Sequence, residues 1–123
     1  MKKCNKLAAL ALAALALSAC ADKAGIRGTL ADAPGSIIAV KQLDINTFRD
    51  HDSIKVGADG SFRYDVKVAK GQPEFIYLFY GDTRIAALLL EKGERVTVET
   101  DTLGRYTVRG SEGSAELAKV DRA

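Results

Sequence analysis

The chain has 123 residues, of which 47% are hydrophobic, and 18 Lys and Arg against 16 Asp and Glu give it a formal net charge of +2. Three of these lysines lie in residues 1–19, which hold no acidic residue. The remaining 104 residues therefore carry 15 basic and 16 acidic side chains, a net charge of −1. This balance argues against a basic nucleic-acid-binding protein, whose affinity depends on clustered cationic charge. About 100 residues suffice for one domain with a modest core.

The N-terminal segment has the layout of a secretory signal. Three lysines within residues 2–6 precede an unbroken run of Leu and Ala from Leu7 to Leu17, and the small residues Ser18 and Ala19 come before Cys20. A basic region, a short apolar region and small residues at the cut define such a signal. The run is far shorter than the roughly 20 residues that span a bilayer, which argues against a transmembrane anchor. We expect residues 1–19 to be a signal peptide.

The residues at the end of this segment resemble a bacterial lipobox. Leu17-Ser18-Ala19-Cys20 matches the pattern Leu-[Ala/Ser]-[Gly/Ala]-Cys at every position. The resemblance implies cleavage between Ala19 and Cys20, and lipid attachment, with acyl chains such as palmitate, at the Cys20 thiol. Two or more acyl chains anchor a protein far more firmly than one. We therefore expect a lipoprotein of the bacterial cell envelope that faces the periplasm, in either the inner or the outer membrane.

The two cysteines limit the chemistry of the mature chain. Cys4 would leave with the signal peptide and Cys20 would carry lipid, so no free thiol and no disulfide would remain. The compartment would permit disulfides, but thiol redox chemistry would require a thiol that this chain lacks.

From Gly25 onward the hydrophobic residues alternate with polar ones, which predicts half-buried strands. The predicted strands cover residues 26–30, 37–43, 61–69, 75–80, 85–90, 95–100 and 105–109. Asp59-Gly60 and three further glycine-containing turns separate them at short spacing, as in antiparallel sheets. We predict an all-β domain over residues 25–110, an antiparallel β-sandwich or meander of about 7–8 strands, after a lipidated tether at residues 20–24.

Four segments depart from simple alternation. Residues 75–80 are aromatic-rich and predict a strand covered on both faces, whereas the Ala- and Leu-rich residues 85–90 fit either a helix or, as we prefer, a hairpin partner. The polar stretch Asp44–Ser53 predicts a longer connection. Ser114 predicts a helix cap before a short helix at 115–120, within a helical linker over residues 111–123.

The polar residues form no catalytic or metal-binding pattern. His51 is the only histidine, and with no second histidine or thiol it makes no zinc set. The nearby Asp44, Asp50 and Asp52 lack any calcium-loop spacing.

Other side chains with chemical potential have simpler interpretations. Ser111 and Ser114 lack the frame of a nucleophile elbow, so a turn and helix cap explain them better. The aromatic side chains of one predicted strand could form a surface on which a ligand stacks, but they fit better as parts of the core and its rim. These are Phe75, Tyr77, Phe79 and Tyr80. We therefore expect no catalytic residue, no cofactor and no metal.

The order of several short patterns resembles a known domain. These are Ile26-x-Gly28-x-Leu30, then Asp59-Gly60-x-Phe62, then Leu90-Glu91-Lys92-Gly93-Glu94-x-Val96-x-Val98, and finally Tyr106-x-Val108-x-Gly110-Ser111. Over residues 24–117 the chain looks like the uncharacterised N-terminal β-domain of Bacteroidota-type lipoproteins that usually precedes a thioredoxin/peroxiredoxin-like thiol–disulfide oxidoreductase domain. The resemblance implies a lipid-anchored β-sandwich with a helix. The Cys-x-x-Cys motif of the following domain is not present in this sequence.

Three functional hypotheses result. The leading one is a non-catalytic, lipid-anchored accessory domain, with the membrane and a thioredoxin-like domain or protein as partners, and no nucleic acid. The alternative is the N-terminal fragment of a periplasmic thiol–disulfide oxidoreductase whose catalytic domain is missing. A ligand-binding envelope lipoprotein that uses the loop over residues 44–53 ranks third.

Overall fold

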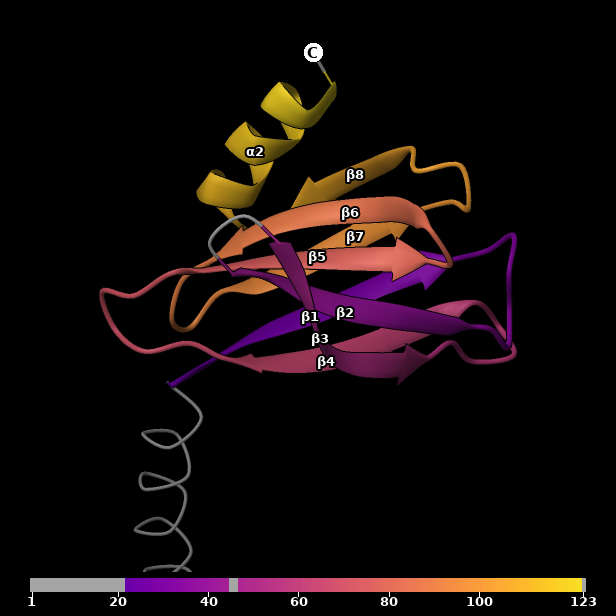
Figure 1. Cartoon of the computed structure of the whole chain (residues 1–123), viewed down its shortest axis with the longest axis horizontal. Coiled ribbons are helices and arrows are strands. Elements are labelled where there is room, and N and C mark those ends of the chain that lie inside the picture. Colours follow the sequence, from indigo (N-terminus) through magenta and orange to yellow (C-terminus); the bar gives the residue numbers. More distant parts are fainter. Residues whose placement is uncertain (1–21, 45–46, 123) are drawn as a thin grey trace, which may run out of the picture.

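The computed structural model describes residues 22–44 and 47–122, which form eight strands and one C-terminal helix (Figure 1). The predicted signal peptide, with Ala19 and Cys20, lies outside the described residues. The strands are β1 (Lys23–Leu30), β2 (Ile37–Asp44), β3 (Thr47–Lys55), β4 (Ser61–Lys67), β5 (Glu74–Tyr80), β6 (Thr83–Leu90), β7 (Arg95–Thr100) and β8 (Tyr106–Arg109), and the helix is α2 (Glu112–Arg122).

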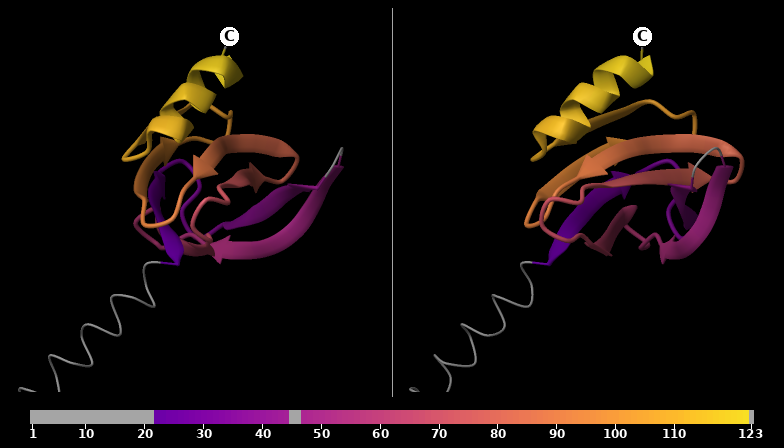
Figure 2. Two further views of the ribbon diagram at one scale, coloured as in Figure 1. Left: turned by 90° about the vertical axis from the view of Figure 1, so that its left-hand side faces the viewer. Right: turned by 60° about the vertical axis from the view of Figure 1, so that its left-hand side comes forward.

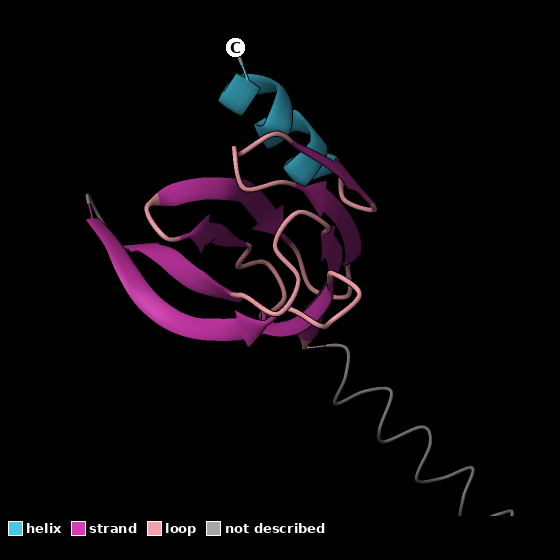
Figure 3. Cartoon of the chain, turned by 90° about the vertical axis from the view of Figure 1, so that its right-hand side faces the viewer, coloured by secondary structure: helices cyan, strands magenta, loops and turns pink. Residues whose placement is uncertain are grey.

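The strands form two four-stranded sheets with the orders β4-β1-β7-β8 and β3-β2-β5-β6. We call them sheet A and sheet B. The two sheets curve around one core, and α2 lies along one side of the domain (Figures 2 and 3). The predicted all-β class is confirmed. The pairing of β1 with β7 is parallel, whereas the other pairs are antiparallel, because the chain returns to the centre of sheet A only after building sheet B.

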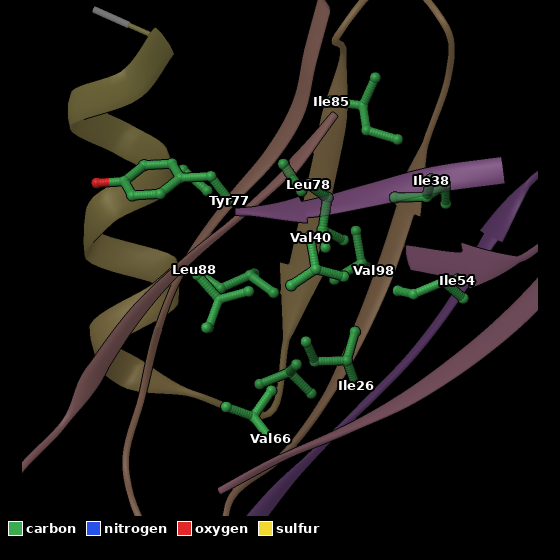
Figure 4. Close-up of a cluster of buried hydrophobic side chains, with 14 of the residues drawn as sticks. Ile26, Ile38, Val40, Ile54, Val66, Tyr77, Leu78, Ile85, Leu88 and Val98 are labelled. Atoms are coloured by element: carbon green, nitrogen blue, oxygen red, sulfur yellow. The ribbon is translucent and has the colours of Figure 1, made fainter. Parts of the chain in front are cut away.

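Alternation along the strands builds the core. In β1 the residues at positions 24, 26, 28 and 30 are buried, whereas Arg27 is exposed, and β4 and β7 repeat this alternation as predicted. Side chains from both sheets meet between them, with Ile26 and Val98 from sheet A facing Val40 and Leu78 from sheet B (Figure 4). Burying one such side chain contributes about 1.5–3 kcal/mol.

The two continuous apolar segments are adjacent strands. β5 and β6 pair in antiparallel register, with Tyr77 opposite Ala87, so the strand interpretation of residues 85–90 is confirmed. Both strands are covered on their two faces: Ile76, Tyr77 and Leu78 are buried in succession, and α2 packs against β6. This double covering, rather than helical propensity, explains the run of Ala and Leu.

Gly28 makes room for close packing within sheet A. The Phe62 ring lies over it from the neighbouring strand β4, where the two residues are cross-strand partners. A Cβ atom on Gly28 would lie 2.6 Å from the Val98 carbonyl oxygen. Glycine is therefore required at position 28 because a Cβ atom does not fit there. At Gly60, in the turn before β4, glycine is required because the φ of 85° is strained for other residues.

The prediction of a long connection over residues 44–53 is wrong. β3 occupies Thr47–Lys55 and pairs with β2 in antiparallel register. The pairing begins with Ile37 opposite Lys55, and the register shifts between Val40 and Lys41. The segment lacks alternation because β3 is an edge strand: within residues 51–55, where burial is described, His51, Asp52 and Ser53 are exposed and Ile54 is buried in the core. Backbone pairing, which the side-chain pattern does not report, makes this segment a strand.

The helix begins earlier than predicted, and a different serine caps it. The Ser111 hydroxyl accepts the Ser114 N–H at 3.1 Å, and the Ser111 carbonyl accepts the Ala115 N–H at 3.0 Å. These bonds identify Ser111 as the N-cap. Ser114 lies in the first turn of α2, where its hydroxyl binds β6 instead. At the other end of the domain, β1 begins at Lys23, two residues before the predicted start of the domain.

Candidate functional site

The start of β1 is fixed to the sheet from its first described residues. The Asp22 carbonyl accepts the Val68 N–H, and the Lys23 carbonyl accepts the Gly93 N–H, both at 2.9 Å. Lys92 Nζ lies 3.1 Å from Asp22 Oδ1. With Ala24 only 1% exposed, the backbone has little freedom from Asp22 onward. We call this end of the domain, formed by Asp22–Lys23, Lys67–Gln72 and Glu91–Glu94, the entry end.

The entry end lies close in sequence to the predicted lipid-attachment residue. Cys20 precedes Asp22 by two residues, and two extended residues reach at most about 7 Å. A lipid on Cys20 would therefore be joined to the sheet almost without a flexible linker. Among the described residues, no helix is long and apolar enough to cross a membrane.

The predicted site residues in the 44–53 segment do not assemble a metal site in the described structure. Across residues 22–44 and 47–122, no three His, Cys, Asp or Glu side chains gather closely enough to hold a metal ion. His51 is exposed. Asp44 and Asp50 have strand backbones, and nothing is described of their side chains.

Asp52 instead joins the edges of the two sheets. Its Oδ2 accepts the Tyr64 hydroxyl at 3.0 Å, which links β3 to β4. The Ser53 N–H and then this hydroxyl lower the pKa of the Asp52 carboxyl. Burial, followed by the neighbouring Asp52, raises the pKa of Tyr64 to about 12. Across the physiological pH range the Tyr64 phenol therefore stays neutral and the Asp52 carboxylate stays charged.

The turn between β7 and β8 is held by two aspartates. Asp101 Oδ1 accepts the backbone N–H groups of Leu103 and Arg105, and Arg105 Nε donates to Oδ2 at 2.8 Å. The Arg105 N–H is the main cause of the lowered pKa of Asp101. From the β1–β2 loop, Asp32 accepts the Thr102 hydroxyl at 2.8 Å. These carboxylates are occupied in fixing loops.

The two serines of the Gly-Ser-Glu-Gly-Ser segment also have structural roles. Ser114 is fully buried, accepts the Leu89 N–H at 3.0 Å and donates to the Leu89 carbonyl at 2.9 Å. Ser111 donates to the same carbonyl at 3.2 Å. The preferred interpretation as turn and cap therefore holds for Ser111, while Ser114 docks α2 on β6.

The aromatic side chains of β5 divide as predicted between core and rim. Tyr77 is 8% exposed and points away from the core side chains toward the side where α2 lies (Figure 4). Arg84 lies over its ring at 5.8 Å from the centroid, and Lys41 Nζ lies 4.5 Å from the centroid of the Phe79 ring. Phe75 is 42% exposed, and Tyr80 is half-buried. The Lys41 and Arg84 side chains therefore already cover two of these four aromatic rings.

A shallow groove of about 360 Å³ lies on the outer face of sheet A. Gly25 forms part of its floor, since its missing side chain opens space between Asp65 and Arg95. Arg27 and Arg63 also line it, and its end at Lys23 and Gly93 belongs to the entry end. The alternation of polar residues along each strand gives no sign of this groove, because the groove depends on the pairing of β1 with β7.

The fold and these contacts define a small β-sandwich domain whose described polar groups fix edges and loops. Residues 25–117 match the family described as a domain of unknown function (DUF4369), and the chain belongs to this family. No curated protein matches the chain.

Proposed function

We propose that this chain is a non-catalytic, lipid-anchored accessory domain of the bacterial cell envelope. The observation that carries the proposal is the junction between the Leu17–Cys20 pattern and β1. A lipobox directly before a strand whose first carbonyls are already hydrogen-bonded would hold the domain at the membrane surface without a long linker. Membrane anchoring by two or three acyl chains is effectively stable.

The position of α2 supports an accessory role. The start of β1 and α2 lie on opposite sides of the domain, so the sandwich separates the tether from the helix (Figure 1). Val120 on this helix is 73% exposed. A partner that binds at α2, such as the thioredoxin-like domain or protein implied by the resemblance, would be held on the side of the domain away from the tether.

The lipid anchor is tested by metabolic labelling of the full chain with radioactive palmitate in a bacterial host. Cys20→Ala is expected to abolish labelling and release the protein from the membrane fraction. Cys4→Ala provides the matched control and is expected to keep the label, because Cys4 would be removed with the signal peptide. A labelled, membrane-bound Cys20→Ala protein would show that the lipobox interpretation is wrong.

The non-catalytic role is tested separately with the purified lipidated protein. Insulin reduction and peroxide consumption are expected to stay at the level of buffer in the presence of dithiothreitol or NADPH-driven reductase systems. Turnover above this background that scales with protein concentration would contradict the accessory role while leaving the anchor intact.

A further inference from the structure

The outer face of sheet A carries an excess of cationic side chains. Its outward residues on β4, β1, β7 and β8 include six cations and two carboxylates: Lys23, Arg27, Arg63, Lys67, Arg95, Arg109, Asp65 and Glu99. Glu99 lies 3.9 Å from Arg109, and the remaining acids described along the groove are Asp65 on β4 and Glu94 at the entry end. The chain as a whole is near-neutral after residue 19, so this charge is concentrated on one surface.

The arrangement of the arginines opposes folding. Arg27 lies directly opposite Arg63 in the antiparallel β1–β4 pair. On its other side Arg27 pairs with Thr97 of β7, and Thr97 in turn lies opposite Arg109 of β8. Like charges at opposed positions in a sheet are destabilising. Neither Arg27 nor Arg63 forms an ion pair with another described residue. An external anion would relieve this repulsion and fit the groove that both side chains line.

This basic face adjoins the entry end. The groove runs from Lys23 and Gly93 along β1 and β7, so its near end is at most three residues from Cys20. We infer that the outer face of sheet A lies against the membrane and that Arg27, Arg63 and Arg95 contact the phosphates of anionic phospholipids. This inference rests on the proposed lipid anchor, since the anchor brings the face to the bilayer. Polybasic surfaces next to a membrane anchor are attracted to anionic head groups in this way.

The test uses a reporter on the lipidated full-length protein. The mature protein would have no free thiol, so a single cysteine introduced by Thr97→Cys can be labelled with a fluorophore in the groove. The labelled protein is reconstituted into vesicles of phosphatidylcholine alone or with 30% phosphatidylglycerol, and quenching by the neutral molecule acrylamide is measured. We expect at least twofold weaker quenching in the anionic vesicles, with the difference lost at 0.5 M NaCl because salt screens exposed charges.

Matched variants separate this face from general charge effects. Arg27→Gln with Arg63→Gln is expected to abolish the protection of the Thr97 reporter, whereas Lys55→Gln with Lys119→Gln, which removes the same charge elsewhere, is expected to retain it. A reporter at Thr83→Cys, outside this face, is expected to be quenched equally in both vesicle types.

The outcomes also distinguish the two proposals. If mass spectrometry finds no acyl chain on Cys20, the lipid anchor fails, and the membrane orientation fails with it. If Cys20 is acylated but the Thr97 reporter is quenched equally in both vesicle types, or if both double variants behave alike, only the membrane-facing role of sheet A is overturned.

Discussion

Ser114 and Leu89 exchange both hydrogen bonds that a neighbouring strand would otherwise provide. The Ser114 hydroxyl accepts the Leu89 N–H and donates to the Leu89 carbonyl, while β6 is the edge strand of sheet B. Unpaired edge groups attract other strands, and proteins commonly cover them. Here the Ser114 side chain of α2 binds both backbone groups of Leu89 at this edge and fixes the helix on the sandwich.

Replacing Ser114 with alanine should weaken the docking of α2. The substitution leaves the half-buried Leu89 N–H without its partner, at an expected cost of about 1 kcal/mol in unfolding free energy. Urea unfolding followed by circular dichroism measures this cost. Ser53→Ala is the control, because Ser53 is exposed and its hydroxyl has no described role. Equal stability of the two variants would contradict the docking role.

Gly28 and Gly25 form a matched pair within β1. An alanine methyl at Gly28 would approach the Val98 carbonyl oxygen to 2.6 Å and the Phe62 ring even more closely, whereas at Gly25 its nearest neighbour is Asp65 Oδ1 at 3.6 Å. Gly28→Ala should therefore cost about 1–3 kcal/mol through overpacking. Gly25→Ala should leave the thermal midpoint nearly unchanged. A reversed order of thermal midpoints would show that the close packing of Phe62 on Gly28 is misassigned.

Tyr64 should make the protein sensitive to alkali. Its pKa is about 12 in the folded chain, above the value of about 10 for an unfolded tyrosine. The contribution of the neutral Tyr64 phenol to the unfolding free energy is therefore fully present below pH 10, and it is lost as the pH rises through 12. Tyr64→Phe should flatten the decline in unfolding free energy over this window, as measured by urea titrations at successive pH values. An unchanged decline would assign the effect to another group.

The Thr100 side chain links the two sheets. Its hydroxyl donates to the Ile85 carbonyl, so a residue of β7 in sheet A is bonded to β6 in sheet B. Thr100→Val keeps the shape but removes the donor, with an expected loss of about 1 kcal/mol. Thr107→Val, at an exposed position on β8, is the control in the same urea titration and should change little. Equal midpoints for both variants would argue against this link.

The sequence alone determined the strand class because side-chain alternation is a local property. Arg27 between two buried positions, and Gly60 before β4, are each readable from a few neighbouring letters, and so is the pattern around Cys20 that resembles a lipobox. These local patterns sufficed for the fold class and for most strand boundaries.

The tertiary structure decided what depends on residues far apart in the chain. β3 forms by backbone pairing at a sheet edge, β1 lies beside β7 in parallel, and Ser114 binds a strand 25 residues earlier. The basic face on sheet A exists only because this order brings Arg27 and Arg63 together with Arg95. Local periodicity contains no information on which strands become neighbours, so neither the edge contacts nor the charged surface could be found before the sheets were assembled.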